Sequence, residues 1–129
     1  MILVDTSAWV EFLRGTGSPV CERVESLLAD DTAITDPILM EVLAGARDER
    51  HLHDLRGLLG RSGMVHCLPA DYAHAALLYR QCRQAGETVR RLIDCLIGAV
   101  ALREGLPLLH NDSDFDVLAR HTGLLLHPA

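Results

Sequence analysis

Short apolar runs alternate with helical patterns along the chain. The same order of patterns occurs over residues 1–13 and again over residues 32–44. Each segment begins with an apolar run, continues with residue types that cap helices, and ends with an apolar stretch at helical spacing. The runs that predict strands are residues 1–4, 32–35, 64–68, 107–110 and 124–126. The patterns that predict helices are residues 8–13, 19–28, 38–44, 48–59, about 69–85, about 89–104 and a short one ending at Arg120.

This alternation predicts an α/β fold with one parallel sheet of about five short strands and helices on both faces. A chain of 129 residues has room for one ordinary domain, so we expect a single domain over residues 1–129. In such sheets, ligands bind beyond the carboxyl ends of the strands. Polar residues that follow a strand are therefore the first candidates for a functional site.

The charge composition excludes several function classes. All twelve cationic residues are Arg, and with 18 acidic residues the formal net charge is −6. Without Lys, a phosphate-binding P-loop and Schiff-base chemistry both lack their essential amine. The net negative charge also argues against a protein that binds nucleic acid through its overall charge. Any contact with nucleic acid must therefore use local features.

Cysteine usage and hydropathy indicate a chain that works in the cytoplasm. The four cysteines form no CxxC pair, and no secretory signal pattern is present, so we expect reduced thiols. The longest apolar stretch, residues 92–102, is well short of the ~20 residues needed to span a bilayer. His51 and His53 are two residues apart, which is the wrong spacing for a zinc-binding helix pair, and no GxSxG nucleophile motif occurs.

Asp94 carries the strongest single signal for chemistry. It is the only charged residue in the apolar stretch 92–102, where an ionised carboxylate needs an ion pair, a shifted pKa or a metal. A purely structural alternative is pairing with Arg90 or Arg91, which lie four and three residues earlier on the predicted helix.

Other acidic residues are ambiguous singly but informative together. Glu41 is the one charge in residues 38–44 and could face solvent, while Asp5 could simply cap its helix. However, Asp5, Glu41 and Asp112 each follow a predicted strand, so they can converge on one crevice. Clustered carboxylates repel one another unless a hard cation such as Mg²⁺ or Mn²⁺ is bound. Such a site can activate water for attack on a phosphate.

Four segments together resemble PIN-domain ribonucleases, and more narrowly the VapC-type toxins of bacterial toxin–antitoxin pairs. The resemblance covers nearly the whole chain, in order and at similar spacing. The segments are residues 2–9 (ILVDTSAW), 41–45 (EVLAG), 94–99 (DCLIGA) and 109–115 (LHNDSDF).

The resemblance implies a Mg²⁺- or Mn²⁺-dependent endoribonuclease that cleaves RNA, most often tRNA. Its catalytic acids would be Asp5, Glu41, Asp94 and Asp112, of which Asp5, Asp94 and Asp112 would bind the metal. The resemblance also assigns supporting positions, which are Ser7, Asp114 and His110. Many relatives have Thr or Ser at the position of His110, so this residue either contacts phosphate or water or simply packs beside the site.

The resemblance further implies a homodimer and inhibition by a small VapB-type antitoxin, forming a hetero-oligomer. An Arg of the antitoxin would suit the acidic groove, because guanidinium pairs with carboxylate in a bidentate manner. RNA must still approach an acidic chain. Residues 80–91 hold four Arg against the single acid Glu87, so we predict phosphate contacts there, with a solvated helix end as the alternative. The four residues are Arg80, Arg83, Arg90 and Arg91.

Two alternatives to a nuclease stay open at this point. A metal-dependent phosphatase of the haloacid dehalogenase type also begins with an Asp after a strand, but it needs a second acid where this chain has Ser7. A catalytically inactive module could use the same carboxylates to hold a metal or a partner's Arg. The presence of all four acids favours the enzyme.

Overall fold

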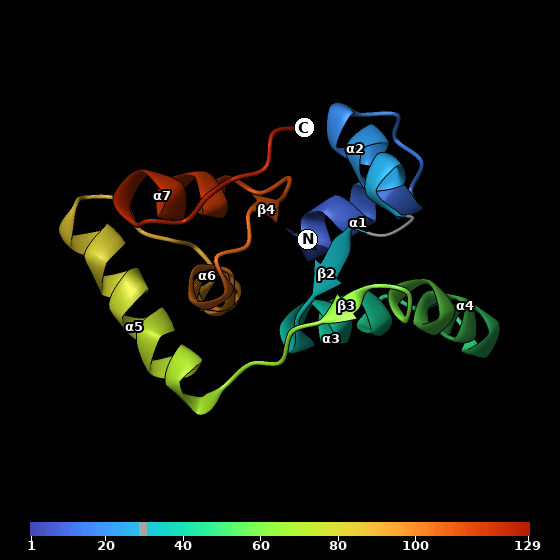
Figure 1. Ribbon diagram of the computed structural model, residues 1–129, viewed down its shortest axis with the longest axis horizontal. Coiled ribbons are helices and arrows are strands. Elements are labelled where there is room, and N and C mark those ends of the chain that lie inside the picture. Colours follow the sequence, from blue (N-terminus) through green and yellow to red (C-terminus); the bar gives the residue numbers. More distant parts are fainter. Residues whose placement is uncertain (29–30) are drawn as a thin grey trace.

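The computed structural model describes residues 1–28 and 31–129, and these form an α/β fold (Figure 1). Over this part of the chain there are four strands, β1 (Ile2–Val4), β2 (Thr32–Ile34), β3 (Gly63–Met64) and β4 (Leu108–Leu109). Seven helices connect or follow them, which are α1 (Thr6–Leu13), α2 (Pro19–Leu27), α3 (Asp36–Ala44), α4 (Glu49–Leu59), α5 (Pro69–Gln84), α6 (Leu92–Glu104) and α7 (Ser113–His121).

All strands pair in parallel, in the order β3-β2-β1-β4. The central strand β1 pairs through Leu3 with Ala33 on one side and Leu108 on the other. Because the strands are parallel, the residues that follow β1, β2 and β4 emerge at the same edge of the sheet. The chain turns into α1, α3 and α7 there, which brings three helix starts to one edge.

The sheet differs from the sequence prediction in the number and length of its strands. The described residues form four strands rather than about five, because the apolar run 124–126 makes only an isolated bridge between Leu126 and Leu108. The run predicted over 64–68 forms a strand at Gly63–Met64 only. Both segments are apolar enough to lie against the core, but they leave the plane of the sheet after one or two pairings.

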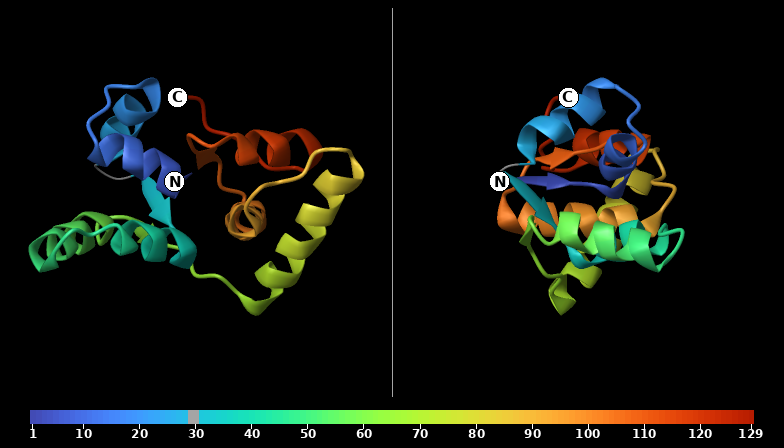
Figure 2. Two further views of the ribbon diagram at one scale, coloured as in Figure 1. Left: turned by 180° about the vertical axis from the view of Figure 1, so that it is seen from behind. Right: turned by 90° about the vertical axis from the view of Figure 1, so that its right-hand side faces the viewer.

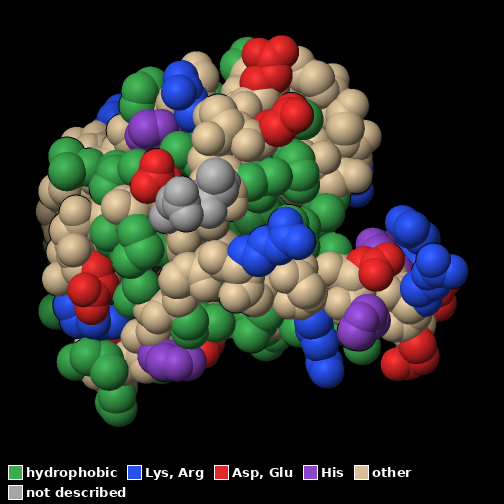
Figure 3. Space-filling view, turned by 45° about the vertical axis from the view of Figure 1, so that its right-hand side comes forward, with side chains coloured by type: hydrophobic (Ala, Val, Ile, Leu, Met, Phe, Trp, Pro, Cys, Tyr) green, Lys and Arg blue, Asp and Glu red, His purple; other side chains and the backbone are tan. Residues whose placement is uncertain are grey.

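The helices are arranged as layers around the sheet. Helices α1 and α2 lie on one side of the sheet, whereas α5, α6 and α7 gather on the other, as Figure 1 and the left view of Figure 2 show. Helices α3 and α4 extend together beyond the sheet as an arm. In the space-filling view this region forms a projecting lobe on which Arg, His and acidic side chains are mixed (Figure 3). The predicted placement of helices on both faces is therefore confirmed.

Helix α6 is the buried centre of the second layer. Every residue from Asp94 to Ala101 is buried, which explains why this helix shows no polar face in the sequence. It begins at Leu92 rather than near residue 89 as predicted, with Arg91 as its N-cap, and it ends at Gly105, whose φ of 64° suits glycine. No helix in residues 1–28 and 31–129 is long and apolar enough to cross a membrane. All four cysteines are free thiols.

Candidate active site

The predicted acidic residues converge on one groove at the carboxyl edge of the sheet. The groove has a volume of about 270 Å³. Its lining comes from the ends of β1 and β4, from α1, from α3 and from the start of α6. The lining residues are Asp5, Thr6, Ser7, Val10, Glu11, Arg14, Glu41, Arg91, Asp94, Asn111 and Asp112.

Asp5 is fixed by the turn that begins α1. Its Oδ2 accepts hydrogen bonds from the backbone N–H of Ser7 (2.9 Å) and from Ser7 Oγ (2.6 Å), so Asp5 is the N-cap of the helix. Ser7 Oγ in turn accepts the backbone N–H of Asn111 at 2.8 Å. Asp5 can therefore cap the helix and also serve the groove. Its Oδ2 is used by the cap, whereas its Oδ1 is not.

Asp94, Asp112 and Asp114 form the tightest group of carboxylates. Each offers an oxygen within 4.8 Å of the other two. Asp94 projects from the first turn of α6 and is 2% exposed, and Asp112 caps α7 by accepting the backbone N–H of Asp114 at 3.0 Å. The resemblance assigned Asp114 a supporting role only, but the structure makes it a member of this group.

The buried oxygens of the groove fit a divalent cation. Within the described residues, Asp5 Oδ1 and Asp94 Oδ2 are buried and have no hydrogen-bond partner. Both residues line the groove together with Glu41 and Asp112. Such a set of carboxylates matches the all-oxygen ligand sets that Mg²⁺ and Mn²⁺ prefer. The donor chemistry of the groove therefore suits a hard cation.

Burial also changes the protonation of these carboxylates. Desolvation raises the pKa of Asp94 to about 8, and the neighbouring carboxylates of Asp114 and Asp5 add to the shift. Desolvation likewise raises the pKa of Asp5 above its ordinary range. Desolvation opposes ionisation of Asp114 too, but hydrogen bonds with Asp94 and with the Arg90 and Arg91 segment outweigh it and lower its pKa. Without a cation, the Asp94–Asp114 pair therefore retains a proton on Asp94 at neutral pH.

Asp114 also holds the loop that precedes α6. Its two oxygens accept the backbone N–H groups of Arg90 and Arg91, each at 3.0 Å. The guanidinium of Arg90 contacts Asp114 at 3.1 Å and Asp112 at 2.7 Å. Arg90 therefore pairs with the two acids at the start of α7. The alternative pairing of Arg90 with Asp94 along one helix is not formed.

Arg91 lies across the groove and contacts a different acid. Its guanidinium hydrogen-bonds to Glu41 and lies 4.0 Å from Asp94 Oδ1. Glu41 also accepts the hydroxyl of Thr6 at 2.9 Å. The predicted i,i+3 pairing of Arg91 with Asp94 is thus present only as a long contact, and it leaves Asp94 Oδ2 without a partner.

His110 packs beside the groove rather than lining it. Its Nδ1 accepts the backbone N–H of Asp112 at 3.0 Å, and its ring lies 5.4 Å from the ring of Phe115. Nε2 is 3.6 Å from Asp116, and the side chain is 11% exposed. Of the two roles that the sequence left open, the packing role matches these contacts, because His110 fixes the backbone that carries Asp112.

The other predicted residues fall into two groups. Arg80 and Arg83 are exposed on α5 and do not line the groove, and Arg83 lies over the ring of Tyr79 at 5.4 Å. The structure therefore separates them from Arg90 and Arg91, which carboxylates already engage. Sequence reasoning missed Thr6, Asn111 and Arg14 as groove residues. Thr6 directly follows Asp5 and Asn111 directly precedes Asp112 in the sequence. This adjacency to predicted catalytic acids is the signal that could have identified both residues.

Comparisons with known proteins agree with this geometry. Residues 2–121 match the PIN domain family. Ribonuclease VapC11 of Mycobacterium tuberculosis is 46% identical over 128 residues, which cover 96% of each chain. This chain belongs to the VapC ribonucleases of the PIN-domain family. The family resemblance inferred from the four sequence segments is therefore confirmed, and the chain is a ribonuclease by family.

Solved structures of VapC ribonucleases and their complexes share the fold. DNA-bound VapBC from Salmonella typhimurium matches with a TM-score of 0.78 at 21% identity, covering 98% of both chains. VapC20 of Mycobacterium tuberculosis, described as a sarcin–ricin loop cleaving toxin, matches with a TM-score of 0.67 at 18% identity, covering 90% of this chain and 93% of that one. At these identities the likeness supports the VapC fold alone.

Proposed function

We propose that the chain is the toxin of a toxin–antitoxin pair and acts as a Mg²⁺- or Mn²⁺-dependent endoribonuclease. Asp5, Glu41, Asp94 and Asp112 are its catalytic acids. The observation that carries the proposal is the pair of buried carboxylate oxygens, Asp5 Oδ1 and Asp94 Oδ2, which lack hydrogen-bond donors in the part of the chain described and belong to two residues that line one groove.

The residues of the groove have different proposed roles. Asp5, Asp94 and Asp112 would hold the cation, which when bound activates water and neutralises charge that builds up on the phosphate. Ser7 orients Asp5 through its 2.6 Å hydrogen bond. Glu41 lines the groove from α3 and accepts the hydroxyl of Thr6, and from there it can accept a proton from water that approaches the phosphate.

Asp114, His110 and Arg90 support this arrangement without lining the groove. Asp114 anchors the backbone of the loop before α6, and His110 accepts the backbone N–H of Asp112. Arg90 offsets the negative charge of Asp112 and Asp114. These contacts hold the carboxylates together against their mutual repulsion before a cation binds.

We propose tRNA as the substrate class, and a VapB-type antitoxin as the partner that inhibits the enzyme in a hetero-oligomer. The family resemblance supports both. The acidic groove suits an Arg of such a partner, because Arg91 already occupies part of it in the same way. We also propose a homodimer, for which the exposed Tyr72 and Leu92 on α5 and α6 provide an apolar surface.

Chelation is expected to abolish RNA cleavage. Purified protein, free of antitoxin, is incubated with total RNA and Mg²⁺ or Mn²⁺, with and without a chelator. We expect discrete fragments that disappear with the chelator, because the groove contains no Lys and only carboxylates to activate water. Sequencing the fragment ends tests the tRNA proposal separately. If folded protein gives no cleavage with either metal, the non-catalytic alternative replaces the nuclease.

Arg80 and Arg83 remain candidates for phosphate contacts at a distance from the groove. We expect Arg80→Ala with Arg83→Ala to weaken RNA binding by about threefold at low salt, and less at high salt, because phosphate contacts are screened. Fluorescence anisotropy with labelled tRNA over a salt series measures this. An unchanged affinity at low salt would assign both residues to the solvated helix surface.

A further inference from the structure

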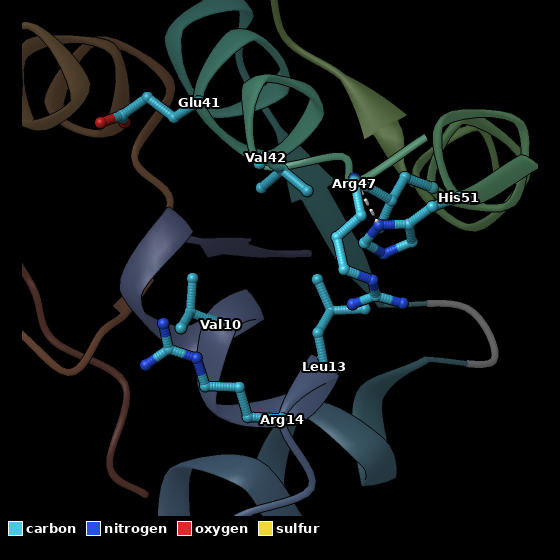
Figure 4. Close-up of a pocket in the computed structure, with 9 residues that line it drawn as sticks. Val10, Leu13, Arg14, Glu41, Val42, Arg47 and His51 are labelled. Atoms are coloured by element: carbon cyan, nitrogen blue, oxygen red, sulfur yellow. Dashed lines mark hydrogen bonds between the residues drawn. The ribbon is translucent and has the colours of Figure 1, made fainter. Parts of the chain in front are cut away.

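A second hollow adjoins the acidic groove between α1, α3 and α4 (Figure 4). Its volume is about 340 Å³. Val10, Arg14 and Glu41 line both hollows, so the two are direct neighbours. The residues that line the second hollow are Val10, Leu13, Arg14, Glu41, Val42, Gly45, Arg47, His51 and Leu55. We call it the side hollow.

The side hollow is cationic where the adjoining groove is acidic. Arg14 and Arg47 lie on opposite walls, one from the end of α1 and the other from the α3–α4 connection (Figure 4). Neither guanidinium makes an ion pair or side-chain hydrogen bond with any residue in 1–28 or 31–129. Glu41 is the one acid in the lining, and Figure 4 shows its carboxylate turned away toward the acidic groove.

Arg47 is held in place by the start of α4. Its backbone N–H donates to His51 Nδ1 at 3.0 Å, and the backbone N–H of His51 donates to Asp48 at 2.8 Å. These bonds fix the connection between α3 and α4. They also leave His51 Nε2 as a hydrogen-bond donor, so a third donor joins the two guanidinium groups around the hollow.

The floor of the side hollow is aliphatic. Val42 and Leu55 are buried below it, while Leu13 is 42% exposed at its rim. The volume lies at the low end of the roughly 300–1,000 Å³ range of small-molecule pockets. An apolar floor of this size between two guanidinium groups suits one base with its neighbouring phosphate, since Arg planes also stack on unpaired bases.

We propose that the side hollow binds the nucleotide next to the scissile phosphate of the RNA substrate, with Arg14 and Arg47 on its phosphate and Leu13 against its base. This inference rests on the proposed ribonuclease function. It explains how an acidic chain receives a polyanion, because Arg90 and Arg91 are engaged by carboxylates while Arg14 and Arg47 are available beside the groove. A strand with a phosphate at Asp5 and Asp94 would reach the side hollow past Arg14, which lines both hollows.

The test compares three double variants of the full chain. Arg14→Ala with Arg47→Ala removes both guanidinium groups, and Arg14→Lys with Arg47→Lys keeps two point charges. The matched control, Arg50→Ala with Arg56→Ala, removes two exposed charges from α4 that do not line the side hollow. Circular dichroism checks the fold of each. Affinity for a short fluorescein-labelled single-stranded RNA is measured in chelator over a salt series, and KM and kcat are measured with Mn²⁺.

We expect the Ala pair to raise KM by about tenfold at low salt with little change in kcat. The reason is that the two Arg side chains would bind the substrate and the transition state equally well. The slope of log affinity against log salt should fall by about 0.7, since both guanidinium groups contact the same phosphate and each single-strand phosphate contributes about 0.7. The Lys pair should restore most of the affinity, because an ammonium group serves as a point charge for phosphate. The control pair should behave as wild type.

Equal affinity of the Ala pair and the control pair would overturn the inference. So would unchanged RNA affinity combined with lost binding of the cognate antitoxin, which would assign the side hollow to a protein partner. Because RNA affinity is measured in chelator, it tests the side hollow independently of catalysis. Absence of cleavage by wild-type protein would instead count against the proposed function.

Discussion

Asp94→Asn is expected to lower the rate of RNA cleavage at least about a hundredfold, because outer-shell changes alone cost 10- to 100-fold at metal sites and Asp94 is proposed as a direct ligand. An amide at this position keeps the shape of the side chain but removes the negative charge. The variant should still fold, since Asp94 is buried in α6 and its Oδ2 makes no hydrogen bond to the rest of the described chain. RNA affinity in chelator should change little.

The matched control is Asp116→Asn. Asp116 follows the same strand and lies in the first turn of α7, but its side chain is 51% exposed and does not line the groove. Cleavage rates of the two variants are compared with wild type under saturating RNA and Mn²⁺. If Asp94→Asn cleaves at the rate of Asp116→Asn, Asp94 has no part in the mechanism and the cation site must be sought elsewhere.

Asp94 could be predicted from the sequence because local pattern and chemistry point the same way. A single carboxylate in an apolar helix must be explained, and α6 is buried along most of its length, as the pattern indicated. The edge that gathers Asp5, Glu41 and Asp112 was equally predictable, because parallel strands place their carboxyl ends together.

Contacts between distant segments could not be predicted in this way. Arg91 reaches Glu41 across 50 positions, and Asp114 accepts the backbone N–H groups of residues 90 and 91. Nothing in local periodicity encodes these bonds, so the sequence suggested Arg90 and Arg91 as free phosphate contacts. The same limit explains the missed Arg14, which reaches the groove only because α1 and α3 pack together. It also explains why the fifth strand was predicted wrongly, because residues 124–126 pair with the sheet at one position only.

The free energy of unfolding in chelator is expected to fall by about 2–4 kcal/mol between pH 5 and pH 8 through Asp94. The pKa of Asp94 is raised from an ordinary value of 3.8 to about 8, chiefly by desolvation. Native protein therefore keeps a proton through this range that the unfolded chain has already lost. Stability must fall as pH rises until Asp94 ionises in the native state as well.

The neighbouring carboxylates do not reverse this sign. Burial raises the pKa of Asp5, which adds to the fall. The pKa of Asp114 is lowered, so the stability that it contributes is lost only below its ordinary range, outside this window. Urea unfolding of wild type and Asp94→Asn at several pH values reports the contribution of Asp94 together with its coupling to Asp5 and Asp114, because groups that do not interact with Asp94 titrate equally in both. The difference between the two curves should grow toward pH 8, with Asp94→Asn the more stable.

Excess Mg²⁺ or Mn²⁺ should reverse this loss in wild type and not in Asp94→Asn. A cation that binds the native state stabilises it by mass action, and it needs the ionised carboxylate that high pH supplies. The same burial that makes Asp94 costly without a cation thus makes it a strong ligand with one. Parallel pH curves for the two proteins, with no effect of cation on their difference, would show that Asp94 is ionised and satisfied without a metal. The buried oxygens that carry the proposed function would then need another partner.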